Sequence, residues 1–170
     1  MKRLITALAL CALCLSATAQ DAQTRLRQML ESGRISFKYH LSAPAAKLKW
    51  VKEGDAVIDG ACYRIYGNEL DIRCDGTTKW TVDEASLEVY IESSEGTVEF
   101  LANPAAYLDM MRDLKVDGST VTGIFHEASQ DADIYFRLDN IKTSPFSGST
   151  DGFTVDTASL DKGWVVTDLR

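Results

Sequence analysis

Apolar and polar residues alternate with a period of two along most of this chain. Residues 35–41 read Ile-Ser-Phe-Lys-Tyr-His-Leu, and a similar alternation recurs in residues 46–50, 69–74, 79–83 and 87–92. Such alternation is typical of antiparallel strands with one buried and one solvated face. The same signal predicts further strands at 121–126, 134–138, 153–156 and 164–168. The chain is therefore expected to form roughly nine to eleven short strands.

Two segments have helical rather than alternating spacing. In residues 21–31, three apolar side chains fall on one face of a helix. A second helix is predicted to begin at Asn103, a favourable N-cap, with Pro104 in the first helical position. Its apolar face would be formed by Tyr107, Leu108, Met111 and Leu114. These elements predict a mainly β domain in which a strongly curved sheet or barrel packs against helices.

The N-terminus has the pattern of a secretory signal peptide. Lys2 and Arg3 precede an apolar run over residues 4–15, and small residues follow at 16–19. A lipid-anchored start is the alternative, but leucine rather than a small residue precedes both cysteines of the run. We expect residues 1–19 to be cleaved and residues 20–170 to form a single domain that is exported as a soluble protein.

Net charge and motifs narrow the function. The chain has 18 basic and 25 acidic residues, and loss of the signal peptide would leave 16 basic ones. This acidic balance argues against binding to nucleic acid or to anionic lipid head groups. Both histidines, His40 and His126, lie on or next to the polar side of their strands, and neither a G-x-S-x-G nor an H-E-x-x-H motif is present. We therefore expect no enzymatic activity and no metal.

After export, Cys62 and Cys74 would be the two remaining cysteines. They flank a predicted hairpin, and an oxidising compartment favours a disulfide between them. A two-residue turn at Gly67-Asn68 would place them on opposite faces, whereas a three-residue loop would place them directly opposite one another. A bulge would satisfy both the disulfide and the apolar face. We predict the disulfide.

The apolar face of the predicted sheet is rich in aromatic residues, and methionines occur on the second helix. Both side-chain types adapt to varied apolar shapes. A helix that carries Met110 and Met111 could act as a lid over the open side of a curved sheet. The alternative is an ordinary filled core, since most apolar faces are core.

Residues 70–91, LDIRCDGTTKWTVDEASLEVYI, resemble the outer-membrane lipoprotein carrier family, LolA, and especially its divergent Bacteroidetes members. The matching features are the Asp75-Gly76 turn, Lys79-Trp80 on the next strand, an acidic turn at Asp83, and Glu88-Val89 on the following strand. The order of the remaining elements also fits, including the Phe-Thr-Val-Asp segment at residues 153–156.

The resemblance implies a LolA/LppX-like fold, a half-open antiparallel β-barrel with a helical lid. Members of this family carry acylated lipoproteins across the periplasm in an apolar cavity, without covalent chemistry or a cofactor. The implied partners are an inner-membrane lipoprotein-releasing transporter and an outer-membrane acceptor, and we expect a periplasmic monomer. With Met110 and Met111 as the lid, the residues expected to line the cavity are Phe37, Tyr39, Leu41, Trp50, Leu70, Ile72, Trp80, Val82, Val89, Ile91, Ile134 and Phe136.

One family feature is missing from this sequence. Better-known members carry an Arg-Pro pair on an early strand, and that arginine helps to gate the cavity. The pair is absent here, and only Arg64 lies nearby. A LolA-like lipid-binding sensor or adaptor that takes no part in lipoprotein sorting is therefore the alternative, and an enzyme acting on a lipid or glycan is the least supported class.

Overall fold

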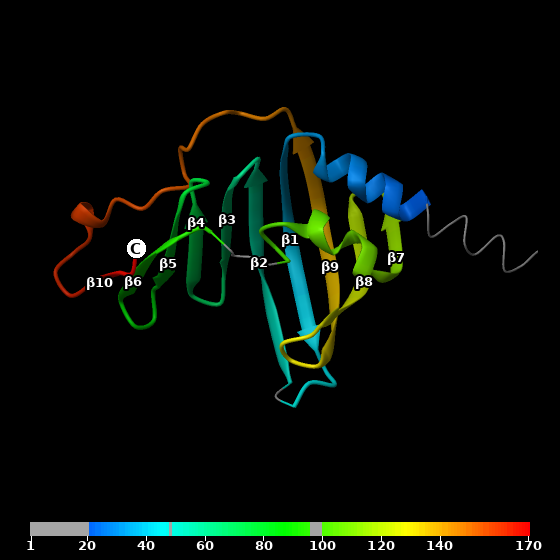
Figure 1. Cartoon of the computed structure of the whole chain (residues 1–170), viewed down its shortest axis with the longest axis horizontal. Coiled ribbons are helices and arrows are strands. Elements are labelled where there is room, and N and C mark those ends of the chain that lie inside the picture. The colour runs from blue at the N-terminus through cyan, green and yellow to red at the C-terminus, as the bar shows by residue number, and fades with distance from the viewer. Residues whose placement is uncertain (1–20, 48, 96–99) are drawn as a thin grey trace, which may run out of the picture.

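A computed structural model of the chain describes residues 21–47, 49–95 and 100–170. Within these residues, ten strands form a single open sheet (Figure 1). Its spatial order is β10-β6-β5-β4-β3-β2-β1-β9-β8-β7, with β10 parallel to β6 and the other neighbours antiparallel. The strands are β1 (Arg34–Ala43), β2 (Trp50–Asp59), β3 (Cys62–Gly67), β4 (Leu70–Cys74), β5 (Thr78–Asp83), β6 (Glu88–Ser93), β7 (Arg112–Asp117), β8 (Thr120–Glu127), β9 (Ala132–Ser144) and β10 (Val165–Asp168).

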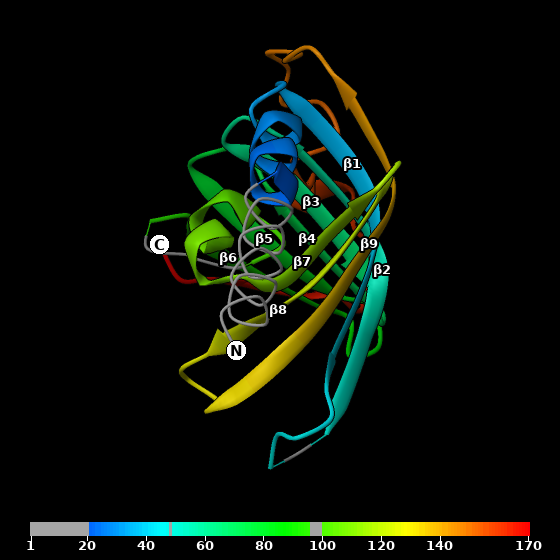
Figure 2. The same ribbon diagram turned by 90° about the vertical axis from the view of Figure 1, so that its right-hand side faces the viewer.

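The sheet curves strongly around one of its faces, which we call the inner face (Figure 2). A helix over residues 21–30 and a segment over residues 100–111 lie against this face, and we call the second of these the covering segment. The covering segment contains a 3-10 helix, η1 (Pro104–Met110). The predicted mainly β domain with a curved sheet and helices on one side is therefore confirmed.

The first helix and the covering segment are bonded to each other as well as packed on the sheet. The Gln23 side-chain amide donates to the Leu108 carbonyl at 3.0 Å and to the Asp109 carboxylate at 3.1 Å. Leu26 and Leu108 are both almost completely buried in the core of the inner face. The helix thus holds one end of the covering segment in place.

Glycines on the inner face allow large aromatic rings to lie across neighbouring strands. A Cβ atom added at Gly54 or Gly67 would come within 2.8 or 2.6 Å of the Tyr39 hydroxyl. A Cβ added at Gly123 would lie 2.7 Å from the ring of Phe136, which is its partner in the β8–β9 pairing. Without side chains at these positions, the two rings occupy space that a β-branched residue would fill.

The outer face carries a second, smaller core. Val82, Val89 and Ile91 are buried there, and Trp80, Val155, Leu160 and Trp164 pack around them. The covering material comes from residues 145–164, which we call the C-terminal strap. It passes from the end of β9 to β10 at the opposite side of the sheet (Figure 1). The sheet is therefore apolar on its inner face at one end and on its outer face at the other.

Two buried carboxylates fasten the strap to the outer face. Asp59 is fully buried and accepts hydrogen bonds from the backbone N–H and the hydroxyl of Ser147 and from Arg34 at 3.2 Å. Burial acts to raise the pKa of Asp59, but the hydrogen bonds from Ser147 and Arg34 outweigh it and hold this pKa below its ordinary value. The guanidinium group of Arg34 also lies 5.6 Å from the centre of the buried Phe153 ring.

The second anchor is Asp71, which lies between two arginines. Arg64 binds it through two hydrogen bonds of 2.8 Å, and Arg73 binds it at 2.7 and 3.1 Å. Arg73 also donates to the Thr154 carbonyl of the strap at 2.9 Å. Burial acts to raise the pKa of Asp71, but hydrogen bonds from both arginines hold it below its ordinary value. Arg64 therefore lies on the outer face and does not point toward the inner face.

Three predicted elements are wrong. The second helix ends at Met110, and the following residues form β7, because Leu114 and Val116 also alternate and this segment pairs with β8, where Val116 lies opposite Val121. Residues 46, 47 and 49 are not in a strand, and β2 begins only at Trp50. Residues 153–156 are irregular and belong to the strap. The predicted signal peptide lies outside the described residues.

The hairpin between β3 and β4 has a register that differs from both predicted ones. Asn68 and Glu69 form its turn, each with a positive φ, so that Tyr63 lies opposite Cys74. Cys62 consequently lies on the outer face and Cys74 on the inner face. Both are free thiols in this structure, and the predicted disulfide is not formed. Two cysteines whose Cβ vectors point to opposite faces cannot be bridged without backbone movement.

Candidate functional site

Two cavities lie between the inner face of the sheet and the elements that cover it. The first, of about 370 Å³, lies near the end of the first helix. The second, of about 330 Å³, lies near the β1–β2 and β8–β9 hairpins. The covering segment contributes to both, through residues 102–105 in the first and through Phe100, Leu101 and Tyr107 in the second.

The second cavity is the more apolar of the two. Its floor is built from alternate residues of β1, β3, β4 and β9, because antiparallel pairing places these side chains on one face. Its lining consists of Tyr39, Leu41, Trp50, Lys52, Ile65, Gly67, Asn68, Leu70, Ile72, Phe100, Leu101, Tyr107, Phe125, Glu127, Gln130 and Ile134. Its volume is at the lower end of the range of natural small-molecule pockets.

A cluster of aromatic rings forms the wall that the covering segment shares with the sheet. The ring of Phe100 stacks on that of Phe125 with centroids 4.6 Å apart, and it meets the ring of Tyr107 edge-on at 5.5 Å. Phe136 joins the cluster at 5.0 Å from Phe100. The covering segment is thus held on the sheet by contacts between apolar rings. An apolar ligand could form similar contacts with the same rings.

Polar groups gather at the rim of the second cavity. The indole N–H of Trp50 donates to the side-chain oxygen of Gln130 at 2.9 Å, which joins the β1–β2 hairpin to the β8–β9 hairpin. The amine of Lys52 lies 5.5 Å from the centre of the Trp50 ring. Asn68 and Glu127 complete the rim. An apolar interior with a polar rim suits a ligand with an apolar chain and a polar end.

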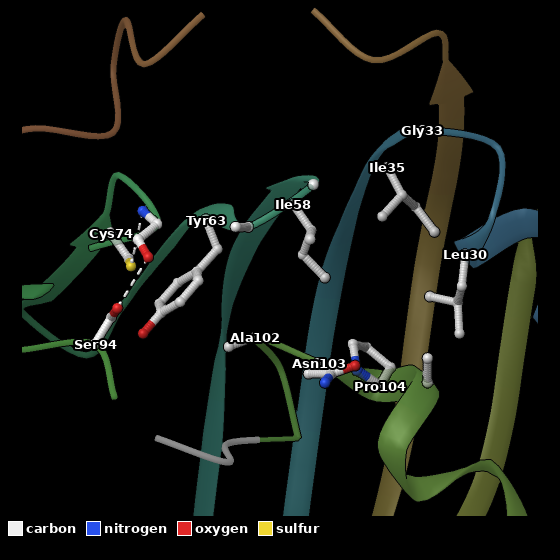
Figure 3. Close-up of a pocket in the computed structure, with 14 residues that line it drawn as sticks. Leu30, Gly33, Ile35, Ile58, Tyr63, Cys74, Ser94, Ala102, Asn103 and Pro104 are labelled. Carbon is white, nitrogen blue, oxygen red and sulfur yellow. Dashed lines mark hydrogen bonds between the residues drawn. The ribbon is translucent and has the colours of Figure 1, made fainter. Parts of the chain in front are cut away.

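The first cavity is mixed in character. Figure 3 shows Tyr63, Cys74 and Ser94 at one end and Leu30 and Ile35 at the other. The sulfur of Cys74 accepts a hydrogen bond from the Gly76 backbone N–H at 3.3 Å, and the Ser94 hydroxyl donates to the Gly76 carbonyl at 3.0 Å. These bonds satisfy polar atoms of the local turn and do not assemble a catalytic group.

The predicted liners fall into three groups. Tyr39, Leu41, Trp50, Leu70, Ile72 and Ile134 line the second cavity. Phe37 and Phe136 lie on the inner face but in its packed core. The prediction of one common face is wrong for Trp80, Val82, Val89 and Ile91, which form the outer core. The connection between β4 and β5 sets Trp80 opposite Arg73 rather than opposite Ile72, and this change of parity turns the apolar side of β5 and β6 outward.

The predicted lid residues do not line either cavity. Met110 is half exposed, and Met111 is partly buried against the core of the inner face. The residues that close the second cavity are instead Phe100, Leu101 and Tyr107, and Phe125 supports them from β8. Tyr107 was visible in the sequence as part of an apolar helical face. Phe100 and Leu101 belong to no alternating or helical pattern of apolar residues in the sequence. Periodicity therefore gave no signal that they line the cavity.

Tyr39 contributes a phenol to the lining of the second cavity. Burial, together with the nearby Asp55 carboxylate, raises the pKa of Tyr39, so its phenol stays neutral. Across residues 21–47, 49–95 and 100–170, no three His, Cys, Asp or Glu side chains are grouped as a metal site would require. The helices of the same part of the chain are all too short or too polar to cross a membrane.

Comparisons with known proteins give no family. No protein-family model matches the chain, and no curated protein does. Among solved structures, the chain is similar to the crystal structure of an uncharacterized conserved protein from Thermus thermophilus, with a TM-score of 0.47 and 7% sequence identity. The match covers 88% of this chain and 98% of that one. At this level of similarity it carries no inference about function.

Proposed function

We propose that this protein is a periplasmic carrier that shelters acyl chains of lipoproteins between its curved sheet and the covering segment, for transfer to the outer membrane. The observation that carries the proposal is the second cavity, which is apolar inside, polar at its rim and closed by aromatic side chains. A LolA-like half-open barrel with a helical lid belongs to the same proposal, as do an inner-membrane transporter and an outer-membrane acceptor as partners.

The energetics of the covering segment support reversible binding. Phe100, Leu101, Tyr107 and Leu108 are all buried. Exposing such side chains costs about 1.5–3 kcal/mol each, or roughly 6–12 kcal/mol together. An acyl chain that buries about ten methylenes gains about 8 kcal/mol. Because the two quantities are similar, acyl chains can displace the covering segment and be displaced by it without a source of chemical energy at this site.

The cavity volume sets a requirement on this mechanism. Groups of about 30 Å³, roughly the volume of a liquid water molecule, fit about ten times into 330 Å³. This is enough for part of one acyl chain and too little for three. A triacylated cargo therefore requires the covering segment to move away and the two cavities to join.

The same observation favours a second candidate, a LolA-like lipid-binding sensor or adaptor that holds one free lipid. In that case the cavity would be used at its present size. The two candidates differ in cargo, since the carrier must bind triacylated protein and release it, whereas the sensor needs to bind only a single-chain lipid.

A loading and release experiment tests the proposal. The protein, expressed without residues 1–19, is mixed with a synthetic triacylated lipopeptide, separated by size and then incubated with phospholipid vesicles. The carrier should elute with the lipopeptide and then lose it to the vesicles. A protein that binds monoglyceride but not the lipopeptide would refute the carrier and leave the sensor, and a protein that binds neither would refute both.

A further inference from the structure

We infer that the second cavity takes acyl chains with an anionic end, and that Lys52 is the residue that recognises the negative charge. This inference rests on the proposed function, because it requires an acyl chain in the cavity. It adds the chemical class of the polar end, a carboxylate or a phosphate.

The position of Lys52 is the first observation. It lies opposite Leu41 in the β1–β2 pairing, so its side chain belongs to the inner face together with those of Trp50 and Ala56. Lys52 as a whole is exposed, so its amine is open both to solvent and to a ligand at the rim. The stem of Lys52 lines the cavity, and its amine lies over the Trp50 ring at the rim. Within the part of the chain that the structure describes, no carboxylate lies within ion-pair distance of this amine.

The neighbouring amides at the rim are the second observation. The side-chain oxygen of Gln130 accepts from the Trp50 indole, and that of Asn68 accepts from the Glu53 backbone N–H at 3.2 Å. These bonds fix the oxygen ends of both amides, so the NH₂ ends are the halves that can donate to a ligand. The rim thus combines an ammonium group with two amide donors, which is the pattern that an anion requires.

One carboxylate shares the rim and opposes an anionic ligand. Glu127 accepts hydrogen bonds from the backbone N–H and the hydroxyl of Ser129, at 3.2 and 3.0 Å, and these bonds hold its side chain on its own hairpin. Its charge nevertheless repels an anion near Lys52. Charge-removing substitutions at the two positions should therefore act in opposite directions.

Calorimetric titration with laurate, lauryl phosphate and neutral monolaurin, each below its micelle concentration, tests the inference. Lys52→Gln should weaken binding of the anionic ligands about three- to fivefold and leave monolaurin unchanged. Glu127→Gln should strengthen binding of the anions. Lys52→Arg should restore most of the affinity, and added salt should reduce the difference between anionic and neutral ligands. Tighter binding of lauryl phosphate identifies a phosphate end and tighter binding of laurate a carboxylate end, and either result supports the inference.

The matched control is Lys115→Gln, which removes the same charge from an exposed lysine on the outer face of β7. It should bind all three ligands as the unmodified protein does. Equal affinity for monolaurin and the anions, or an unchanged affinity in Lys52→Gln, would overturn the inference while the proposed function stands. Failure of all three ligands to bind would overturn both.

Discussion

Leu70→Glu is expected to block acyl chains at the mouth of the second cavity without unfolding the protein. Leu70 lies opposite Gly67 in the β3–β4 pairing and lines the cavity, yet its side chain is 36% exposed. A carboxylate at this position can stay hydrated in the empty protein. The free energy of unfolding should therefore change by less than about 1 kcal/mol, close to the value for surface substitutions.

A bound acyl chain would change this balance, because its methylenes displace water from the new carboxylate. Complete burial of an unpaired charge costs far more than the binding energy of one chain. At the rim the carboxylate can turn partly toward solvent, and a penalty of about 1–2 kcal/mol corresponds to roughly 5- to 30-fold weaker binding. Monolaurin is the suitable ligand, since a neutral head group avoids the charge of Lys52 on the same rim.

The assay compares calorimetric affinity for monolaurin with stability in urea. Leu87→Glu is the matched control, because Leu87 is 43% exposed at the turn between β5 and β6 and lines neither described cavity. Residue 87 has a left-handed backbone conformation. Leucine and glutamate are similarly strained in it, so the substitution adds no backbone strain of its own. The reasoning would be refuted if Leu70→Glu folded normally and bound monolaurin as tightly as Leu87→Glu.

The remaining predictions concern the anchors of the strap and the cysteines. Asp71→Asn should lower the free energy of unfolding by about 2–3 kcal/mol, because it removes the buried carboxylate that pairs with two partly exposed arginines. Asp55→Asn removes an exposed ion pair and should lower the free energy of unfolding by less than about 0.5 kcal/mol. If the two variants lost the same stability in urea unfolding, Asp71 would not act as a buried anchor. Because the native pKa values of Asp59 and Asp71 lie below the ordinary value, their contribution to stability is complete above about pH 4 and is lost as the pH falls through the native pKa. Urea midpoints should therefore fall with acidification, and less steeply in a variant with asparagine at both positions; parallel curves would show that other groups are responsible. Cys62 and Cys74 should both take up an alkylating agent when the unreduced protein is denatured, and a mass lacking both adducts would contradict the register of the hairpin.

The sequence predicts the inner face well where strands follow one another through a simple alternation. Residues 35–41 of β1 show the buried and exposed positions directly, and the first helix follows from its apolar spacing. The same alternation is present in β5 and β6, but it does not determine whether their apolar side chains lie on the inner or the outer face of the sheet. That choice depends on the number of residues in the β4–β5 connection, where one residue more or less reverses every side chain.

The strap and the covering segment could not be read from the sequence for a different reason. Ser147 and Thr154 reach the sheet through irregular backbone, which has no period for a pattern to detect. Their partners, Asp59 and Asp71, occupy polar positions of alternating strands and therefore resemble solvated residues, although both are buried. Phe100 joins the aromatic cluster only through the tertiary fold, where β8 and the covering segment meet.

The central claim is that acyl chains bind between the sheet and the covering segment, in the second cavity. Trp50 lines this cavity, whereas Trp80 and Trp164 pack in the outer core. A monolaurin brominated near the end of its chain quenches an indole that it contacts. The account predicts that this ligand quenches the tryptophan fluorescence of the unmodified protein, and that Trp50→Phe abolishes the quenching while calorimetric binding persists. Quenching that remains in Trp50→Phe, or binding without any quenching in the unmodified protein, would contradict it.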